Sequence, residues 1–483
     1  MLQYYLLAAF AALALTQFLK SHKAMNLVAI AHAIACIAFA ACLQYSGAIP
    51  VYYLENNLYI DALSTYEIFI AGTIFLLAAV YAGGHAESLI KIGILERKNL
   101  KGYYLSFNAL LLFTVLAFSS NNLALFWIFA ELTTFFTAFL IAILNSKKNI
   151  DASLKYIFVT STAMLFSFIG LILLFALTEK TLGTGTLNWD VLLKNAKTFP
   201  AAPLAASFAF MFLGYAAKSG IAPLHTSLPH AYSKAPSAVS AIISAVMLNI
   251  GIYGILRIYS ITRQNPGSAA TCSNLLIAFG ILSLFIAAFS MLQQKNLKKL
   301  IAFSSTEHAG LMLIGIGIGT PIAIYWTLYH VLAHSLTKAL LFLSAGILNR
   351  QYDSNKIENI KNALKLQPLA SAGLILGSLA IIGIPPAIVF ITKFSILAQV
   401  AKFSMILLIA VLLLLLLAAA GFALFITAIF TRIDENDVMR RYPTPVRMKI
   451  PVIILIILVY GLGLFFPQPL DGALNSIVSG LGF

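Results

Sequence analysis

Residues 403–431 read FSMILLIAVLLLLLLAAAGFALFITAIFT, a run of 29 residues without a single charged or ionisable side chain. A helix needs about 20 predominantly apolar residues to cross the hydrocarbon core of a bilayer. This run is therefore long enough to cross a membrane as one helix. It predicts a membrane-spanning segment without the help of any motif.

The rest of the chain has the same character. Of its 483 residues, 61% are hydrophobic and 10% are charged, whereas soluble domains are about 45–50% apolar and about 25% charged. One soluble core could not bury so much apolar surface. The sequence therefore predicts an all-α polytopic membrane protein with about 14 transmembrane helices, at 1–19, 25–45, 62–83, 103–120, 122–145, 153–178, 202–228, 236–261, 270–293, 300–318, 322–347, 368–400, 403–431 and 449–466.

Cysteine content and net charge exclude other classes of protein. Cys36, Cys42 and Cys272 all lie in apolar stretches, so they predict no disulfide framework. The net charge of +15 is typical of nucleic-acid binding, but the basic residues are dispersed in short connections between apolar runs. We therefore expect the lipid bilayer, and no nucleic acid, as the partner of this charge.

The basic residues predict the orientation in the membrane. No basic residue precedes the first apolar run, and Lys20 and Lys23 follow it, which is the opposite of a secretory signal. We expect a retained helix with its N-terminus outside. Alternating from there, 22 of the 31 basic residues fall at cytoplasmic ends, near 20–23, 91–101, 147–155, 234, 295–299, 350–365 and 432–449. Six fall outside: Lys180, Lys194, Lys197, Arg257, Arg263 and Lys402.

A weak internal repeat relates two parts of the chain. Glu131 and Glu307 are 176 residues apart, and Lys218 and Lys393 are 175 apart. Both lysines lie in spans (the seventh and the twelfth) that contain helix-breaking residues, namely Gly220, Pro223, Gly383, Pro385 and Pro386.

A five-helix unit that is repeated once must insert upside down the second time, and paired broken helices in inverted halves indicate an ion site near the midplane. Two matched spacings can also arise by chance in a chain with so many helices. The repeat divides the chain into N-terminal helices 1–102, five-helix units 103–262 and 268–432, and a last helix with its tail, 433–483.

Ionisable residues inside the apolar runs form the candidate site. A charge at the centre of a membrane helix costs roughly 2.5–3.5 kcal/mol, so such residues persist when they face a partner or a wet cavity. Carboxylate, amine and imidazole groups can each hold and release a proton. We therefore predict a proton relay through Glu131, Lys218, His308, His330, His334, Lys338 and Lys393, with Glu307 in a supporting place. His225 and His230, beside the break after Lys218, are where a proton could enter.

Each of these residues also has a simpler explanation. A lone histidine on an apolar helix usually packs, and we assign that role to His22, His32 and His85. A lysine near a helix end can extend to the headgroups, but Lys338 and Lys393 lie too far from the ends. His330 and His334, at i and i+4, could share a metal. We predict no metal site, because no third ligand of the usual kind is present and Lys338 would repel a cation.

Five motifs occur in order along the chain: Trp127-Ile-Phe-Ala-Glu-Leu132, the segment 218–240, Ser304-Ser-Thr-Glu-His-Ala-Gly310, residues 334–342, and Gly383-Ile-Pro-Pro386 followed by Lys393. Together they resemble the antiporter-like membrane subunits shared by respiratory complex I, Mrp cation/proton antiporters and group-four membrane-bound hydrogenases. The Ser-Thr-Glu-His run and the Leu248-Asn249 pair are most similar to component F of hydrogenase-4 and formate-hydrogenlyase-type complexes.

The resemblance implies a proton-translocating subunit that couples electron transfer elsewhere in a complex to proton movement. It implies that Glu131 pairs with Lys218, that His308, His334 and Lys338 form the central relay, and that Lys393 ends it. It also implies a prokaryotic cell membrane and, as partners, other antiporter-like and small membrane subunits with a peripheral hydrogenase-like or NADH dehydrogenase-like arm. Fe–S clusters, a NiFe centre or flavin would belong to those partners, because this chain has no Cys-rich cluster motif, nucleotide loop or haem pair.

One position departs from the family pattern. The family commonly has a lysine in the middle of the span at 236–261, where this chain has Asn249. Asparagine can hydrogen-bond a water molecule but cannot carry the proton. This departure leaves open a structural membrane anchor with an inactive channel. Independently of it, an Mrp-type cation/proton antiporter subunit without redox chemistry also stays open.

Overall fold

The computed structural model describes residues 1–91, 96–430 and 441–483. Arg432 and Arg440, two of the basic residues expected at cytoplasmic ends, lie outside the described residues. Residue 431, the last of the apolar run 403–431, and the boundary expected between 432 and 433 also lie outside them.

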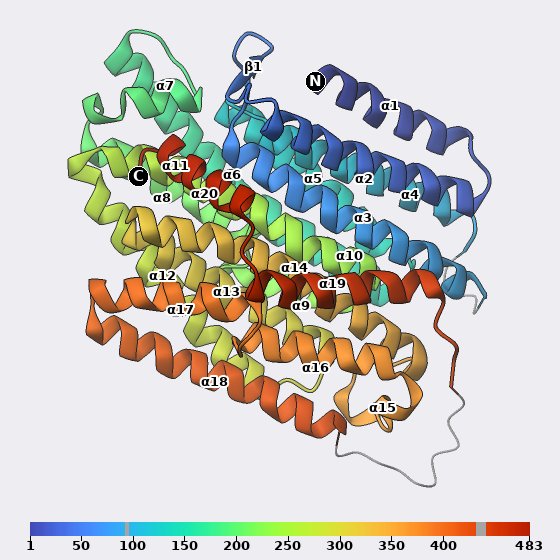
Figure 1. Ribbon diagram of the computed structural model, residues 1–483. Coiled ribbons are helices and arrows are strands. Elements are labelled where there is room, and N and C mark those ends of the chain that lie inside the picture. Colours follow the sequence, from blue (N-terminus) through green and yellow to red (C-terminus); the bar gives the residue numbers. More distant parts are fainter. Residues whose placement is uncertain (92–95, 431–440) are drawn as a thin grey trace.

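Apolar runs of the sequence fold into long helices that lie alongside one another (Figure 1). In hydrocarbon every backbone N–H and C=O must be satisfied within the protein, and a helix does this within one segment. The helices are α1 (Leu2–Phe18), α2 (His22–Tyr45), α3 (Ala62–Lys91), α4 (Asn99–Phe118), α5 (Leu123–Ala142), α6 (Lys147–Leu182), α7 (Trp189–Lys194), α8 (Ala201–Lys218), α9 (Ser227–Lys234), α10 (Ser237–Ile242), α11 (Leu248–Gln264), α12 (Pro266–Leu292), α13 (Leu297–Ile318), α14 (Pro321–Tyr352), α15 (Ala363–Leu366), α16 (Pro368–Ile382), α17 (Ile388–Phe403), α18 (Met405–Phe430), α19 (Val446–Leu464) and α20 (Gln468–Gly480).

Twelve helices among the described residues are long and apolar enough to cross a membrane. One of these spans, Ser237–Gln264, runs continuously through α10, a five-residue π-helix η3 (Ile243–Met247) and α11. Two shorter apolar helices, α1 and α16, lie within the remaining expected runs, 1–19 and 368–400. The multi-pass membrane class that the composition predicts is therefore confirmed.

Two of the expected spans are interrupted. α8 ends at Lys218, and a short 3-10 turn, η2 (Leu224–Thr226), leads into α9. Likewise α16 ends at Ile382, and α17 begins at Ile388. Glycine adopts the left-handed backbone at both breaks, with φ of +71° at Gly220 and +96° at Gly383. The prolines that follow cannot donate a backbone hydrogen bond, so neither helix continues.

A third irregularity, η3, was not expected from the sequence. This π-helical turn lies directly before α11. The carbonyl of Ala245 within it accepts a hydrogen bond of 2.7 Å from Ser335 Oγ on α14. Single π turns inside helices occur often at functional sites. The turn therefore marks the middle of the 236–261 span as a place to search for function.

The two ends of the helix bundle carry different small elements (Figure 1). One end carries an antiparallel hairpin, β1 (Val51–Tyr53) with β2 (Leu58–Ile60), and also α7. Asn121 holds these together, because its Nδ2 donates to Asn56 O and to Asp190 Oδ1. The opposite end carries α15 and a short turn, η4 (Ile357–Asn359).

Candidate functional site

Lys218 is the last residue of α8 and is 2% exposed. Its Nζ donates to the carbonyl of Ala130, at 2.7 Å, and to Thr134 Oγ1, at 2.8 Å. Both acceptors lie on α5. The helix break thus leaves an amine held by neutral oxygens inside the bundle.

Glu131 directly follows Ala130 in α5, but its carboxylate does not bind the Lys218 amine. Its Oε2 accepts a hydrogen bond of 2.8 Å from Ser161 Oγ, and its buried Oε1 has no partner. The side chain lines a lateral pocket of about 270 Å³ beside the exposed Phe135. Within the described part of the chain no ion pair joins Glu131 to Lys218, so the pair that the resemblance implies is open in this structure.

The second half of the chain contains a closed pair. Lys393 Nζ lies 2.7 Å from Glu307 Oε1, and both side chains are buried. The same amine donates to the carbonyl of Ile381, at 3.0 Å, in the last turn of α16. Glu307, expected only in a supporting place, is the counter-ion of Lys393 in the structure.

Histidines continue from this pair into the bundle. His308 Nδ1 and His330 Nε2 share a hydrogen bond of 2.8 Å. His330 Nδ1 and Thr392 Oγ1 share another, of 2.7 Å, and Thr392 directly precedes Lys393. His308 Nε2 also lies 4.0 Å from Glu307 Oε1. α13, α14 and α17 therefore bring an acid, an amine and two imidazoles together.

His334 and Lys338 lie further along α14. The His334 ring is 5.4 Å from the His308 ring, and neither of its nitrogens has a hydrogen-bond partner. Lys338 Nζ donates to the carbonyl of Ile301, at 2.7 Å, and to Ser304 Oγ. Lys338 is thus held like Lys218, by neutral oxygens of a neighbouring helix.

The two histidines near the first break do not join this cluster. His225 is buried beside the Phe303 ring, and its Nδ1 has no partner. His230 is exposed on α9. Partial desolvation, followed by the charge of Lys299, lowers the pKa of His230.

Asn249 follows the π turn and contacts a group that the sequence analysis missed. Its Nδ2 donates to Glu67 Oε2, at 3.1 Å, and to Ser335 Oγ, at 3.2 Å, while its Oδ1 has no partner. Glu67 belongs to α3 and is 2% exposed. A glutamate within the apolar run 62–83 is unusual, and this could have identified Glu67 as a candidate from the sequence.

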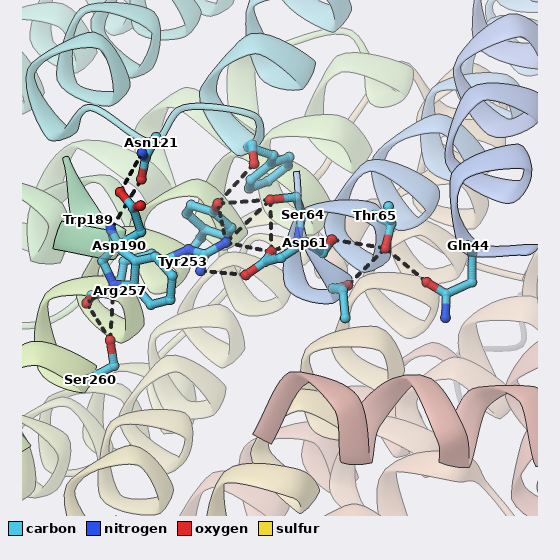
Figure 2. A network of polar contacts seen from close by, with 12 residues as sticks. Gln44, Asp61, Ser64, Thr65, Asn121, Trp189, Asp190, Tyr253, Arg257 and Ser260 are labelled. Atoms are coloured by element: carbon cyan, nitrogen blue, oxygen red, sulfur yellow. Dashed lines mark hydrogen bonds and ion pairs between the residues drawn. The ribbon is translucent and has the colours of Figure 1, made fainter. Parts of the chain in front are cut away.

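Arg257, one of the basic residues expected at an outside end, lies within α11 and is 3% exposed. Its two terminal nitrogens donate to the two oxygens of Asp61, each at 2.7 Å, and its guanidinium stacks 4.3 Å from the Trp189 ring (Figure 2). This position is explained by the ion pair.

Several buried polar atoms of the relay have no protein partner. Buried polar groups are nearly always hydrogen-bonded, so each exception asks for an explanation. The exceptions include Glu131 Oε1, Tyr215 Oη, Asn249 Oδ1, His308 Nε2 and both nitrogens of His334. They extend from α5 across α8 and α11 to α13 and α14.

Within the described ranges, no group of three or more His, Cys, Asp or Glu side chains is arranged to hold a metal ion. Of the two histidines considered as metal ligands from the sequence, His330 has both ring nitrogens in hydrogen bonds, to His308 and to Thr392.

Comparison with known proteins gives a consistent result. A family profile described as "NADH:quinone oxidoreductase/Mrp antiporter, TM" matches residues 120–419. A hydrogenase-4 component F homolog from Methylacidiphilum infernorum is 30% identical over 411 residues, which cover 84% of this chain and 85% of the relative.

Two solved structures share the fold along nearly the whole chain. A chain of the membrane-bound sulfane sulfur reductase, an archaeal respiratory membrane complex, has a TM-score of 0.86 at 23% identity, with 99% of this chain and 96% of that chain covered. A chain of the Mrp complex from Dietzia sp. DQ12-45-1b has a TM-score of 0.84 at 18% identity, with 99% and 98% covered.

Proposed function

This chain belongs to the NADH:quinone oxidoreductase/Mrp antiporter transmembrane family, and from that premise we propose that it is the proton-translocating membrane subunit of a multi-subunit redox complex. The observation that carries the proposal is the buried line of titratable groups Lys393, Glu307, His308 and His330, joined by contacts of 2.7–4.0 Å. A chain that only anchored other subunits would not need such groups, because each is costly in a membrane.

The relay works by opening and closing ion pairs. A charge change in an adjacent subunit draws Glu131 toward Lys218 or releases it, and the released lysine passes its proton inward. The proton crosses the region of Asn249, reaches Lys338, His334, His308 and His330, and leaves from Lys393. At an effective dielectric of about 20, opposite charges 4 Å apart interact by about 4 kcal/mol. That exceeds the roughly 2.3 kcal/mol needed to move one charge across 100 mV.

The open first pair and the closed second pair support this scheme. Glu131 and Glu307, like Lys218 and Lys393, hold corresponding places in the repeat of the sequence. The structure contains one pair apart and the other at 2.7 Å. The two arrangements are the alternate states that the relay requires of each half.

The membrane topology forms part of the proposal. Fourteen spans, two inverted five-helix units at 103–262 and 268–432, and an outside N-terminus agree with the basic residues of the connections. We place the chain in a prokaryotic cell membrane, as the organism of the relative and the archaeal complex suggest.

Partner subunits supply the electron transfer. The relatives are a hydrogenase-4 component homolog and a subunit of an archaeal respiratory complex. Other antiporter-like and small membrane subunits would flank this chain, and a hydrogenase-like or NADH dehydrogenase-like arm would carry any Fe–S, NiFe or flavin group. The chain's own residues hold and move protons.

Replacing Glu131 with Gln and, separately, Lys218 with Ala tests the proposal. Each variant should lose coupled proton translocation, measured in vesicles that contain the intact complex, while the complex still assembles. Replacement of the exposed Lys197 with Ala is the matched control and should leave translocation unchanged. Wild-type translocation in both relay variants would contradict the proposed function.

A second candidate is an Mrp-type cation/proton antiporter subunit, which the family description and the fold shared with the Mrp complex favour. Sodium-dependent proton movement in vesicles without an electron donor would support this function. Proton translocation that requires the electron donor and does not depend on sodium would support the redox-coupled function. A structural anchor, the reading that Asn249 keeps open, would translocate no protons in either assay.

A further inference from the structure

Glu67 is a buried carboxyl of α3 that is not among the predicted relay residues. Asn249 Nδ2 donates to its Oε2 at 3.1 Å. Among the residues that the structure describes, no cation lies within ion-pair distance of it. A carboxyl whose described partner is a neutral amide can gain or lose a proton without breaking an ion pair.

Hydrogen bonds around Glu67 connect three helices, α3, α11 and α14. Asn249, its partner, also donates to Ser335 Oγ on α14, at 3.2 Å. Ser335 in turn donates to the carbonyl of Ala245 in the π turn η3. Ser335 follows His334 directly in the sequence. The carboxyl of α3 is therefore connected through two neutral side chains to the helix that carries His330, His334 and Lys338.

A ladder of polar contacts holds α3 against α11 and places this carboxyl (Figure 2 shows its outer part). Asp61, directly before α3, binds Arg257. Three residues further along α3, Ser64 Oγ lies 3.3 Å from Tyr253 Oη, and three residues further again, Glu67 meets Asn249.

The spacing of this ladder follows from helix geometry. Steps of three residues on α3 and of four on α11 keep each partner on one face of its helix. The two helices run in opposite directions, so each step moves the contact inward by about 4.5–6 Å along the axes. The buried ion pair at the outer end thus fixes the register in which Glu67 reaches Asn249.

A small cavity lies against the carboxyl. Glu67, Tyr253 and Thr327 contribute to its wall with apolar side chains, and its volume is about 10 Å³. This is close to the smallest space that holds one water molecule, about 10–15 Å³. Asn249 Oδ1 on α11 also has no partner, so it is a second buried oxygen that can accept a hydrogen bond.

From this geometry we infer that Glu67 is a proton-exchanging group of the relay, located at the junction of α3, α11 and α14 between the Lys218 side and the His334 side. Asn249 cannot take up the proton itself, and its amide orients the carboxyl. In the step that we assign, the carboxylate accepts a proton from a hydrated donor on the Lys218 side and releases it towards the His334 side. The inference rests on the proposed function.

Variants of Glu67 in the intact complex test this role. Glu67→Gln keeps the hydrogen-bonding shape but cannot exchange a proton, so translocation per electron should fall roughly tenfold or more, as for loss of a general acid–base group. Glu67→Asp keeps a carboxyl and should retain most of the rate. Glu55→Gln, at an exposed position in the turn between β1 and β2, is the matched control and should behave as wild type.

Infrared difference spectra of the working complex give a readout that a structural role would not change. A carbonyl band of a protonated carboxyl should appear or disappear during turnover, shift in Glu67→Asp and vanish in Glu67→Gln. Turnover spectra that are identical in wild type and both variants would overturn the inference, and Glu67→Asp keeps the test usable if Glu67→Gln does not assemble.

Lys218→Ala separates this inference from the proposed function. If Lys218→Ala abolishes translocation but Glu67→Gln translocates as wild type does, the role of Glu67 is wrong and the proposed function stands. If both variants translocate as wild type does, the proposed function fails, and the role of Glu67 fails with it.

Discussion

At the scale of single residues, the buried lysines fall into two kinds of environment. Lys218 and Lys338 donate to backbone carbonyls and hydroxyl groups, whereas Lys393 has a carboxylate at 2.7 Å. A cation held by neutral oxygens can lose its proton without leaving a lone buried anion behind. The paired lysine cannot, because Glu307 would then be uncompensated.

The first prediction concerns this pair. Lys393→Ala should lower the free energy of unfolding by about 3–5 kcal/mol, because it leaves the carboxylate of Glu307 buried without a counter-ion. The double variant Glu307→Gln with Lys393→Met removes both charges and should recover most of the loss. Thermal unfolding of the purified protein in detergent measures both. Equal stability of the two variants would show that the ion pair is not the cause.

At the scale of elements, helix breaks place the amines. α8 stops at Lys218, and α16 stops where the carbonyl of Ile381 accepts from Lys393. Irregular backbone at membrane depth is tolerated only where it is buried in protein or lines water. Helix ends of this kind provide free carbonyls and space for a charged group.

A substitution at Gly383 tests whether this helix break positions Lys393. Its φ of +96° disfavours any residue with a Cβ, and a Cβ there would lie 3.2 Å from Lys393 Cδ. Gly383→Ala should therefore shift the lysine, cost about 1–3 kcal/mol of stability, and reduce proton translocation. Gly480→Ala, where a Cβ would meet nothing within 4 Å, is the matched control. If the two alanine variants translocate equally well, the backbone at this break does not set the position of Lys393.

At the scale of the whole molecule, the proposed orientation separates the two ends of the bundle. Lys197, in the connection between α7 and α8, should lie outside, and Lys365, on α15, should face the cytoplasm. Both side chains are exposed. The opposite ends that these segments occupy make them suitable reporters.

Labelling with a membrane-impermeant thiol reagent checks this prediction. In a Cys42→Ser background, which removes the exposed natural cysteine, Lys197→Cys should react in intact cells and Lys365→Cys only after the membrane is opened. The reverse pattern would place the N-terminus in the cytoplasm. Labelling of both in intact cells would indicate leaky cells, which a cytoplasmic marker protein checks independently.

Membrane class, the places of the helices and the family follow from local sequence, because apolar run length and motif order do not depend on tertiary contacts. The family match over 120–419 confirms the family, and the twelve long apolar helices among the described residues confirm the multi-pass membrane class. The breaks after Lys218 and Ile382 were also readable, since glycine and proline act on their own backbone.

Contacts between distant residues could not be read in this way. Glu307 lies 86 residues from Lys393, Asp61 lies 196 from Arg257, and Glu67 lies 182 from Asn249. Which charge meets which partner depends on helix packing and register. The sequence therefore placed Arg257 only at the end of a span and Glu67 only within an apolar run. Packing alone separates a lysine held by neutral oxygens from one that is paired with a carboxylate.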